Sequence, residues 1–408
     1  MKEANNIPQG YKNSPLGIIP KEWEVKRLGD VCNYVDYRGK SPNKSTKGIF
    51  LVTAKNIREG YIDYEVSQEF IPQDEYEETM RRGKAQIGDV LITTEAPLGH
   101  VAQIDNPNVA LAQRVIKYRG KNDILLNAYL KYFLMSEKFQ TILIANATGS
   151  TALGIKGSRL HQLPVIIPRI KEQELIISVL HLWDTAIEKQ SELIEKLKLR
   201  KRALMQQLLT GKKRLPGFSG EWKEVKLGDV FDERNETNRD DLPLLSITGD
   251  KGVIYQSDSD KRDISNDDKS KYKRICPNDI GYNTMRMWQG RSALSELEGI
   301  VSPAYTIVTP RESINVKFMS MLIQQPRVVY DFWTHSQGLV SDTLNCKYPD
   351  FCQVKVRIPT KQEQTAIASV LVKADKEIEL AKDKLASLQS QKRGLMQQLL
   401  TGKKRINS

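Results

Sequence analysis

The chain has 408 residues, of which 39% are hydrophobic, and its 62 Lys and Arg outnumber its 50 Asp and Glu for a formal net charge of +12. A chain of this length can form two or more domains with cores of their own, and it contains no apolar run of the roughly 18–20 residues that a membrane span needs. The basic balance favours a polyanionic partner, nucleic acid first, although many basic proteins bind none.

The N-terminus and the cysteines indicate the compartment. The opening MKEANNIPQG contains no apolar signal core. None of Cys32, Cys276, Cys346 and Cys352 stands in C-x-x-C spacing or beside a pair of histidines. We therefore expect neither a zinc site nor a disulfide framework, and we expect a cytoplasmic protein with no membrane partner.

The first globular segment, from about residue 23 to residue 168, is typical of a mixed α and β domain. It starts with Trp23 and the Leu-Gly-Asp-Val of residues 28–31. β-type runs lie at residues 48–53, 89–94 and 100–104, a helical stretch at 128–143, and a last strand at 163–168 that ends in proline. We expect an α+β fold built on a curved sheet.

Two groups of polar residues in this segment are candidates for DNA contact. Long cations near Tyr76 suit phosphate groups, namely Arg81, Arg82 and Lys84. Polar residues at and after the strand at 89–94 suit base edges, namely Thr93, Thr94 and His100. A solvated charged face and ordinary loop variation explain these residues equally well.

The chain then repeats itself. Residues 202–215 read RALMQQLLTGKKRL and residues 393–406 read RGLMQQLLTGKKRI, a displacement of 191 (393 − 202). The start of the first segment recurs as Trp222 and the Leu-Gly-Asp-Val of residues 227–230, a displacement of 199 (222 − 23). This period exceeds the roughly 20–50 residues of solenoid units, so it predicts two whole domains related by an internal pseudo-twofold axis.

Each repeat closes with a long helix that carries an apolar seam. Residues 171–210 contain no proline or glycine, and apolar residues recur in steps of four and three, the heptad pattern of a coiled coil. Gly211 and Gly402, each followed by Lys-Lys-Arg, are candidate left-handed caps with cations at the negative end of the helix dipole. The seam comprises Ile176, Leu180, Trp183, Ile187, Gln190, Ile194, Leu197, Lys201, Leu204 and Leu208 in the first helix, and Ile367, Leu371, Ala374, Ile378, Ala381, Leu385, Leu388, Lys392, Leu395 and Leu399 in the second.

We expect the two helices to pair antiparallel within one chain. Parallel pairing would bury Lys201 against Lys392, whereas the antiparallel register in which paired residue numbers sum to 575 places Lys201 opposite Ala374 and Lys392 opposite Trp183. Each lysine can then run along the seam to water, and Lys392 can lie over the indole. A coiled coil between two chains is the alternative, less favoured because the internal partner has the higher effective concentration.

The second globular segment, from about residue 222 to residue 359, has the same plan with different details. β-type runs lie at 244–247, 279–284 and 305–308, a helical stretch at 316–333, and a last strand at 354–359. Candidate phosphate contacts near Tyr272 are Lys269, Lys271, Lys273 and Arg274. Candidate base contacts at and after the strand at 279–284 are Asn283, Thr284, Arg286, Gln289 and Arg291.

The sequence carries no recognised catalytic signature. It lacks a G-x-x-x-x-G-K-[ST] phosphate loop, a Gly-rich cofactor fingerprint and the Pro-Pro-aromatic motif of adenine methyltransferases. Pro349 and Asp350 followed by Gln353 and Lys355 resemble a metal-dependent nuclease core, but Gln353 stands where a second carboxylate is needed. We interpret that segment as the strand leading into the second helix, and we expect no catalytic or metal site.

Together these motifs resemble the specificity subunit of type I restriction–modification systems, over nearly the whole chain. The resemblance rests on the Pro-x-x-x-Glu-Gln that opens each helix, at residues 168–173 and 359–364, and on the repeated helix end and domain start. Residues 285–291 lack the Pro-Leu-Gly order found in the first segment. The resemblance implies target-recognition domains at residues 1–168 and 212–359, long helices at 169–211 and 360–402, and a tail at 403–408.

The resemblance also implies a function. Each domain would read one half of a bipartite double-stranded DNA target, and the helix pair would set the spacer and dock two methyltransferase (modification) subunits, joined by restriction/translocase subunits. The chain would hold no cofactor, because S-adenosylmethionine, ATP and Mg2+ would be used by those partners. The alternatives are a non-catalytic DNA-binding or protein scaffold and, less favoured, a cryptic nuclease.

Overall fold

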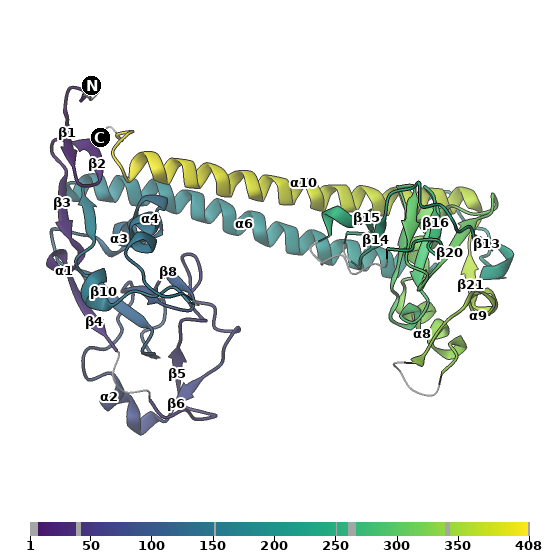
Figure 1. Cartoon of the computed structure of the whole chain (residues 1–408), viewed down its shortest axis with the longest axis horizontal. Coiled ribbons are helices and arrows are strands. Elements are labelled where there is room, and N and C mark those ends of the chain that lie inside the picture. The colour runs from purple at the N-terminus through teal and green to yellow at the C-terminus, as the bar shows by residue number, and fades with distance from the viewer. Residues whose placement is uncertain are drawn as a thin grey trace. The chain divides into compact units, whose positions relative to one another are not determined.

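The computed structural model describes residues 7–37, 42–150, 152–249, 251–259, 267–338 and 343–406. The chain forms two compact units: unit 1 comprises Met1–Ser191 and Lys384–Ser408, and unit 2 comprises Glu192–Asp383. Each unit therefore combines one globular domain with part of each long helix (Figure 1). The predicted boundaries at residues 168, 211, 359 and 402 stay a prediction.

The centre of unit 1 is an antiparallel sheet in the strand order β4-β10-β7-β8. Its strands are β4 (Cys32–Asp36), β10 (Val115–Gly120), β7 (Val90–Thr94) and β8 (Leu98–Gln103). Because side chains of a strand alternate between its two faces, Val90 and Ile92 enter one core while Leu91 enters another. The sheet is thus covered on both faces.

A smaller sheet in the order β6-β5-β9 covers one of these faces. It consists of β6 (Phe70–Ile71), β5 (Ile49–Val52) and β9 (Val109–Leu111), and β9 runs parallel to β5. Two short helices, η1 (Gln73–Glu75) and α2 (Tyr76–Thr79), follow β6.

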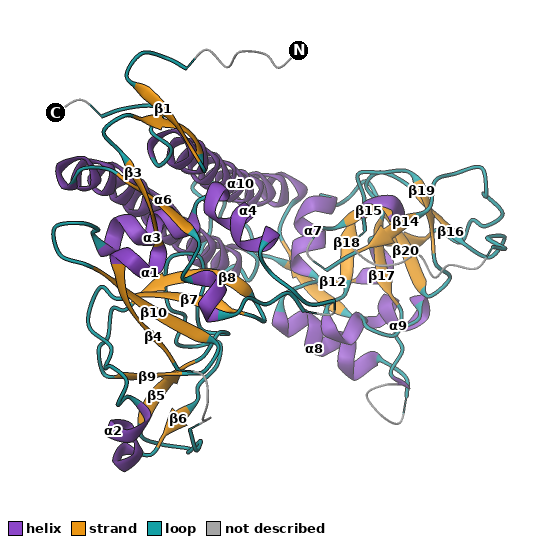
Figure 2. Cartoon of the chain, turned by 60° about the vertical axis from the view of Figure 1, so that its left-hand side comes forward, coloured by secondary structure: helices purple, strands orange, loops and turns teal. Residues whose placement is uncertain are grey.

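Two helices, α3 (Asn127–Met135) and α4 (Glu137–Ala145), cover the other face. Figure 2 shows α3 between the sheet and the start of the long helix α6 (Ile170–Leu208). The sequence predicted a single helix at residues 128–143. Ser136 instead has an extended backbone, and its hydroxyl accepts a hydrogen bond from the Phe139 N–H at 3.3 Å, which caps a second helix.

The remaining elements of unit 1 join the two ends of the described chain. The hairpin of β1 (Tyr11–Ser14) and β2 (Gly17–Pro20) leads to β3 (Glu24–Arg27), which pairs with β11 (Pro164–Ile167). The Tyr11 hydroxyl donates a hydrogen bond to the Gly402 carbonyl oxygen at 3.0 Å. The short helices α1 (Leu28–Val31) and α5 (Gly157–Leu160) complete the unit.

Unit 2 has the equivalent antiparallel sheet, in the order β13-β20-β17-β18. Its strands are β13 (Phe231–Glu233), β20 (Tyr305–Pro310), β17 (Ile280–Asn283) and β18 (Ser292–Leu294). Three two-stranded sheets surround it, formed by β12 (Lys223–Lys226) with β21 (Lys355–Ile358), β14 (Leu245–Ile247) with β15 (Val253–Tyr255), and β16 (Lys273–Ile275) with β19 (Gly299–Val301).

The helices of unit 2 are shorter than predicted. The stretch at residues 316–333 forms α7 (Val316–Leu322) and α8 (Pro326–His335), because Pro326 occupies the first turn of α8. The others are α9 (Tyr348–Gln353) and the one-turn helices η2 (Leu227–Asp229), η3 (Gln256–Asp258) and η4 (Met287–Gln289). Residues 349–353 were predicted as part of a strand. That prediction is wrong, since the strand β21 starts only at Lys355.

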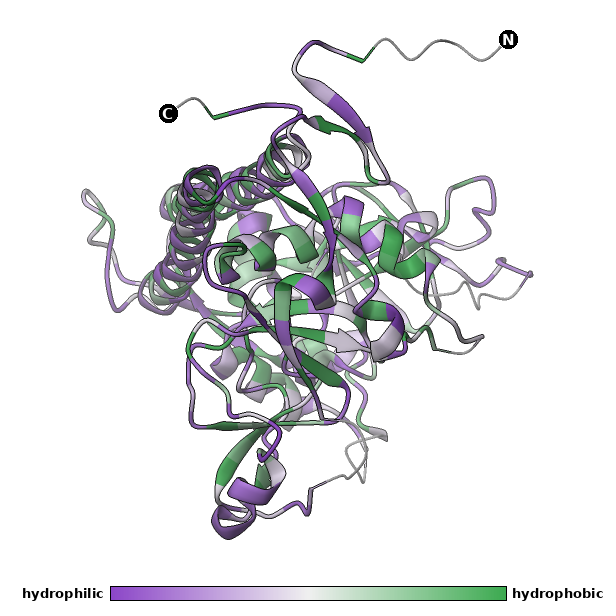
Figure 3. Cartoon of the chain, turned by 90° about the vertical axis from the view of Figure 1, so that its left-hand side faces the viewer, coloured by the Kyte–Doolittle hydropathy of each residue, from purple (hydrophilic) through white to green (hydrophobic). Residues whose placement is uncertain are grey.

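The long helices α6 and α10 (Lys361–Leu399) run antiparallel in each unit. In unit 1, Ile176 near the start of α6 shares a core with Leu399 at the end of α10. In unit 2, Leu208 at the end of α6 shares a core with Ile367 near the start of α10. Every predicted seam residue is buried or half-buried. Figure 3 shows hydrophilic and hydrophobic residues alternating around both helices.

Both long helices end in the predicted glycine caps. Gly211 has a φ of 70° and Gly402 a φ of 71°, in the left-handed region that favours glycine. The N–H groups of Lys213 and Lys404 then donate to the carbonyl oxygens of Gln207 and Gln398 in the last helical turns. Among the described residues, no helix combines the length and apolarity needed to cross a lipid bilayer.

Candidate nucleic-acid interface

A buried aspartate anchors the central sheet of unit 1 just before β7. Asp89 is 0% exposed, and its carboxylate accepts hydrogen bonds from Lys117 Nζ at 3.1 Å and from Arg119 Nε at 2.6 Å. Burial opposes its charge, but the hydrogen bonds from Arg119 and from the Gln86 N–H, with the charge of Lys117, hold the pKa of Asp89 below its ordinary value. Burial also lowers the pKa of Lys117.

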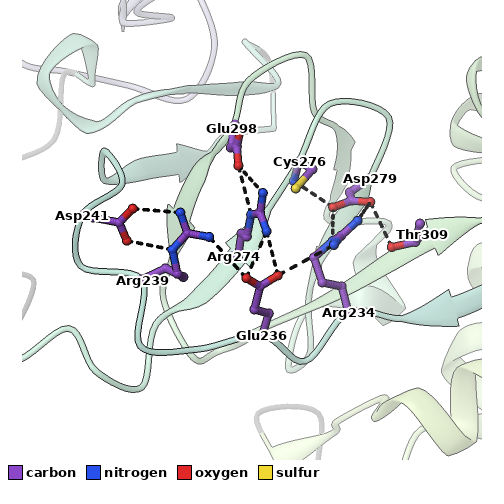
Figure 4. Close-up of polar contacts among 9 residues, drawn as sticks. All are labelled: Arg234, Glu236, Arg239, Asp241, Arg274, Cys276, Asp279, Glu298 and Thr309. Atoms are coloured by element: carbon purple, nitrogen blue, oxygen red, sulfur yellow. Dashed lines mark hydrogen bonds and ion pairs between the residues drawn. The ribbon is translucent and has the colours of Figure 1, made fainter.

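Asp279 occupies the matching position before β17 in unit 2 (Figure 4). It is 1% exposed and accepts hydrogen bonds from Arg234 Nε at 2.7 Å, from Thr309 Oγ1 at 3.0 Å and from the Cys276 N–H at 2.7 Å. The arginine follows β13 here, whereas in unit 1 it comes from β10. The two domains thus neutralise the same buried charge from different strands.

Arg274, a predicted phosphate contact, is bound inside unit 2. Its guanidinium contacts Glu298, with Nε 3.0 Å from Oε1, and Glu236, with Nη1 3.0 Å from both oxygens. Glu236 in turn contacts Arg234 and Arg239 (Figure 4). Because two carboxylates occupy the donors of Arg274, this part of the phosphate prediction is wrong.

The three lysines of the same segment have looser surroundings. Lys273 Nζ lies 3.9 Å from Glu233, and Lys269 Nζ lies 5.7 Å from the centre of the Tyr272 ring. Lys271 is exposed. These lysines stay candidates for phosphate contact.

The basic cluster of unit 1, Arg81, Arg82 and Lys84, is exposed after α2. Arg81 pairs with Glu78 at 3.1 Å and Lys84 with Glu77 at 2.6 Å. Arg82 Nη1 donates to the Asp36 carbonyl oxygen at 2.9 Å, and Arg81 and Arg82 line a pocket of about 290 Å³. Exposed ion pairs of this kind are weak, so a phosphate can replace the carboxylates and all three residues stay candidates.

The predicted base contacts of unit 1 lie mostly inside the domain. Thr93 is 0% exposed and Thr94 is 3% exposed. Thr93 Oγ1 accepts from the His100 N–H at 2.9 Å, and Thr94 Oγ1 donates to the Arg114 carbonyl oxygen at 3.3 Å. The prediction that these threonines contact bases is wrong, because both faces of the sheet are covered.

His100 keeps a partly accessible position in unit 1. Its Nδ1 lies 2.9 Å from the Ile57 carbonyl oxygen. The side chain lines a pocket of about 360 Å³ together with Asp184, Lys392 and Arg393 of the long helices. His100 stays a candidate for contact with DNA.

The predicted base contacts of unit 2 largely converge. Asn283, Arg286, Gln289 and Arg291 all line one cleft of about 680 Å³, which we call the unit 2 cleft. Its other wall includes Thr248, Gly249 and Lys251 of the hairpin between β14 and β15. None of these wall residues was predicted as a contact, although Gly-Asp-Lys-Gly at residues 249–252 is a turn signal. Thr284 is turned inward, its hydroxyl 3.0 Å from that of Thr306.

A pair of clasps, each made of an arginine, a glutamate and a tryptophan, joins the helix ends. In unit 1, Arg405 Nε donates to Glu172 at 2.5 Å, and the Trp23 Nε1–H donates to the same carboxylate at 2.8 Å. Arg405 also lies 5.8 Å from the Trp23 ring centre. The arginine belongs to the Gly-Lys-Lys-Arg after one helix and the glutamate to the Glu-Gln that opens the other.

Unit 2 repeats the clasp with one difference. Arg214 donates through Nε and Nη2 to Glu363, at 2.6 and 2.5 Å, and lies 5.9 Å from the Trp222 ring centre. The indole N–H of Trp222, however, has no hydrogen-bond partner among the described residues. From the sequence, these arginines were interpreted as cations at the negative end of the helix dipole. The Gly-Lys-Lys-Arg and Glu-Gln motifs each occur twice, and this shared repetition was the signal that could have paired each arginine with a glutamate.

The glutamine beside each clasp glutamate ties the helix to its domain. Gln173 accepts from the Leu126 N–H at 2.9 Å and donates to the Pro168 carbonyl oxygen at 2.9 Å. Gln364 accepts from the Asn315 N–H at 2.8 Å and donates to the Pro359 carbonyl oxygen at 2.9 Å. The Glu-Gln pair therefore performs the same two structural tasks in both units.

Comparison with known proteins finds relatives that span the chain. Residues 20–199 match the family model described as type I restriction modification DNA specificity domain. The chain is 23% identical over 435 residues to the putative type I restriction enzyme MjaX specificity subunit of Methanocaldococcus jannaschii, covering 98% of each. It is 29% identical over 198 residues to the MjaIX specificity subunit of that organism, covering 46% of this chain and 45% of the relative.

Solved structures give the same fold. The type I restriction–modification S subunit from M. genitalium aligns with a TM-score of 0.54 at 14% identity, covering 98% of both chains. A chain from a study of complex assembly and conformational transition of the type I restriction–modification system aligns with a TM-score of 0.60 at 17% identity, covering 94% of this chain and 99% of that one.

The family match over residues 20–199, the relatives and the shared fold all indicate a type I restriction–modification specificity subunit. In this specificity subunit the repeated helices carry repeated ion pairs. Lys392 contacts Asp184 in unit 1, and Lys201 Nζ lies 2.5 Å from Asp375 in unit 2.

Two details of the predicted helix register need correction. Lys392 was predicted to reach water, with room to lie over Trp183. Lys392 is only 9% exposed and lies 5.4 Å from the ring centre of Tyr132, whose hydroxyl donates to Asp184 at 2.5 Å. Tyr132 belongs to α3, so the globular domain packs onto the helices at this point.

The described residues of the specificity subunit contain no group of three or more His, Cys, Asp or Glu side chains that could hold a metal ion. Asp350, the acid of the nuclease-like segment, accepts a hydrogen bond from the Lys347 N–H at 3.2 Å and so caps α9. This contact gives the carboxylate a structural task.

Proposed function

We propose that this specificity subunit reads a bipartite double-stranded DNA target, one half with each domain. The observation that carries the proposal is that the two units repeat one backbone architecture but present different polar residues on it. Both units have the same sheet order and clasp, but the unit 2 cleft places Asn283, Gln289 and Arg291 together, while the matching threonines of unit 1 are buried. Different donors and acceptors would select different bases in the two halves.

The exposed cations would position the duplex. Arg81, Arg82 and Lys84 in unit 1 and Lys269 and Lys271 in unit 2 would contact phosphate groups, which supply affinity without sequence information. The net charge of +12 favours this mode of binding.

The long helices would set the gap between the two half-sites and dock two methyltransferase subunits, with restriction/translocase subunits joining that assembly. S-adenosylmethionine, ATP and Mg2+ would act in those partners, and the chain itself would be a non-catalytic recognition subunit. The apolar residues left exposed on the helices, including Leu182, Leu193 and Leu380, support a docking role.

Methylome sequencing tests the target-reading proposal. The chain is expressed with its methyltransferase partner in a host that lacks other DNA methylation. A two-part motif with a fixed gap is expected, and it should vanish when the chain is omitted. Methylation at a single contiguous motif, or a motif that persists without the chain, would contradict the proposal.

A heptad insertion tests the role of the helices. Adding seven residues to both α6 and α10 at paired positions keeps the seam in phase and lengthens each helix by about 10 Å. The gap of the methylated motif should grow by about three base pairs, since DNA rises about 34 Å per turn of about ten pairs. An unchanged gap would show that the length of the helices does not set the spacing of the two half-sites.

The alternatives give different outcomes in simple assays. A protein scaffold would bind the methyltransferase without changing which DNA sequences are methylated. A cryptic nuclease would cleave DNA when the purified chain is supplied with Mg2+, an outcome that would contradict the non-catalytic proposal.

A further inference from the structure

The unit 2 cleft contains an arginine with an unusual position. Arg291 is exposed, and its guanidinium lies directly against the backbone of Gly249. A Cβ atom built on Gly249 would come within 2.2 Å of Arg291 Nη1. Gly249 therefore leaves the space that the guanidinium occupies, and any side chain there would push it aside.

Arg291 also differs from neighbouring arginines in its partners. Arg234, Arg239 and Arg274 each bind carboxylates within the domain (Figure 4). Arg286, which lines the same cleft, has an interaction within the protein. The side chain of Arg291 makes no hydrogen bond or ion pair with any residue in the described part of the chain.

A second observation shows unmet hydrogen-bonding capacity in the same cleft. Ser292 lines it and is 7% exposed, yet its hydroxyl has no hydrogen-bond partner among the described residues. A buried hydroxyl without a partner is costly, and this one lies in the wall of the cleft beside Arg291. The exposed guanidinium of Arg291 therefore presents its donors to a polar group that enters the cleft.

The chemistry of a guanidinium selects one base. Its planar fork donates two parallel hydrogen bonds, which match the O6 and N7 acceptors of guanine in the major groove. Adenine presents an amino donor where guanine presents O6, so the fork does not fit it. Resting on the proposed function, we propose that Arg291 reads a guanine in the half-site bound by the second domain, and that Gly249 positions its guanidinium.

Methylome sequencing of variants in the full complex tests this inference. Arg291→Lys keeps the charge but loses the planar fork. The preference for guanine over other bases at one position in one half of the motif should therefore fall by about 5- to 150-fold, the range of a good bidentate contact. Gly249→Ala should relax the same position, because the methyl group displaces the guanidinium. The other half of the motif should not change in either variant.

Matched controls separate base reading from general damage. Gly220→Ala adds a methyl group where no atom lies within 4 Å, and Arg327→Ala removes a side chain that is 82% exposed. Both controls should leave the motif intact. Thermal unfolding of the purified chains should show unchanged melting temperatures for Arg291→Lys and Gly249→Ala, since only the end of a flexible side chain must move.

Several outcomes would overturn the inference. One is a wild-type motif with no guanine on either strand of the relevant half. Another is an Arg291→Lys variant with unchanged base preference or with a uniform loss at all positions, which would indicate a phosphate contact. A wild-type chain that yields no two-part motif would overturn the proposed function as well, so the two failures are distinguishable.

Discussion

The two units share a frame and differ in what that frame supports. Both have a four-stranded sheet of matching order, a buried aspartate before the equivalent strand and a clasp at the helix ends. Unit 1 adds a three-stranded sheet over a large second core, whereas the second core of unit 2 consists of Leu245, Ile275, Val301 and Ile307 with a few partly buried neighbours. The repeated contacts lie where helix meets domain, so the domain bodies are free to differ.

The largest expected difference between the units is the loss of folding free energy when their buried aspartates are replaced. Asp89→Asn would leave the Lys117 ammonium, 6% exposed, without a counter-charge, at a cost of about 3–5 kcal/mol. Asp279→Asn should cost less, because Arg234 is 26% exposed and can turn to water. Denaturant unfolding followed by hydrogen exchange in each unit measures both, and equal losses would contradict the comparison.

The same aspartate predicts an acid response of unit 1. Because the pKa of Asp89 is held below its ordinary value of 3.8, its contribution to stability is complete above that pH. The contribution is lost as the pH falls through the lower folded-state value. Unit 1 of the wild-type chain should therefore open in acid through a transition that Asp89→Asn weakens, which hydrogen exchange at a series of pH values would detect.

The second largest difference is expected in how much each clasp arginine stabilises the start of the helix that it contacts. In Arg405→Ala, Glu172 keeps the hydrogen bond from Trp23. In Arg214→Ala, Glu363 loses its arginine and has no indole donor, since the Trp222 N–H is not bonded to it. Hydrogen exchange near the start of α10 in Arg214→Ala should accelerate more than exchange near the start of α6 in Arg405→Ala. The reverse order would show that the tryptophan bond contributes nothing.

The seam lysines should show a smaller contrast. Lys392→Ala removes a side chain that is 11% exposed, whose ammonium contacts Asp184 and lies over Tyr132, so unit 1 should lose about 1–3 kcal/mol. Lys201→Ala removes a pair whose side chains are 25% and 47% exposed, and unit 2 should lose less than about 1 kcal/mol. Denaturant unfolding of both variants checks the ranking, and a larger loss for Lys201→Ala would refute it.

The exposed cations should affect stability least. Arg81→Ala should leave the melting temperature unchanged, lower DNA affinity equally for all sequences and reduce the slope of log affinity against log salt by about 1. Arg274→Ala should instead destabilise unit 2, because Glu236 and Glu298 lose their shared partner. Binding titrations at several salt concentrations, with melting curves of the same proteins, distinguish the two roles.

The frame was predictable from sequence because its determinants are local and repeated. The heptad steps of the helices, the glycine caps Gly211 and Gly402 and the paired domain starts are patterns within short windows. The antiparallel direction followed from one electrostatic argument, the cost of burying Lys201 against Lys392. The partners of Lys392 did not follow, because Tyr132 approaches the helices only through the packing of α3.

The candidate interface was harder to predict because exposure is a property of the tertiary fold. Thr93 and Arg291 are equally polar in sequence, but a sheet covered on both faces buries the former. Arg274 follows lysines and suggests a phosphate contact, yet Glu236 and Glu298 reach it from segments 38 and 24 residues away. Only a folded chain shows which charges neutralise one another.

Unit 1 is assembled from both ends of the described chain, which has a consequence for synthesis. Trp23, Ile176 and Leu180 share one hydrophobic core with Met396, Leu399 and Leu400. The last three leave the ribosome only after the whole of unit 2. A nascent chain therefore exposes this apolar surface until unit 2 has been synthesised and has folded. If translation ends anywhere before residue 396, the apolar surface of unit 1 stays exposed. Chaperones and proteases would then recognise the incomplete product by that surface.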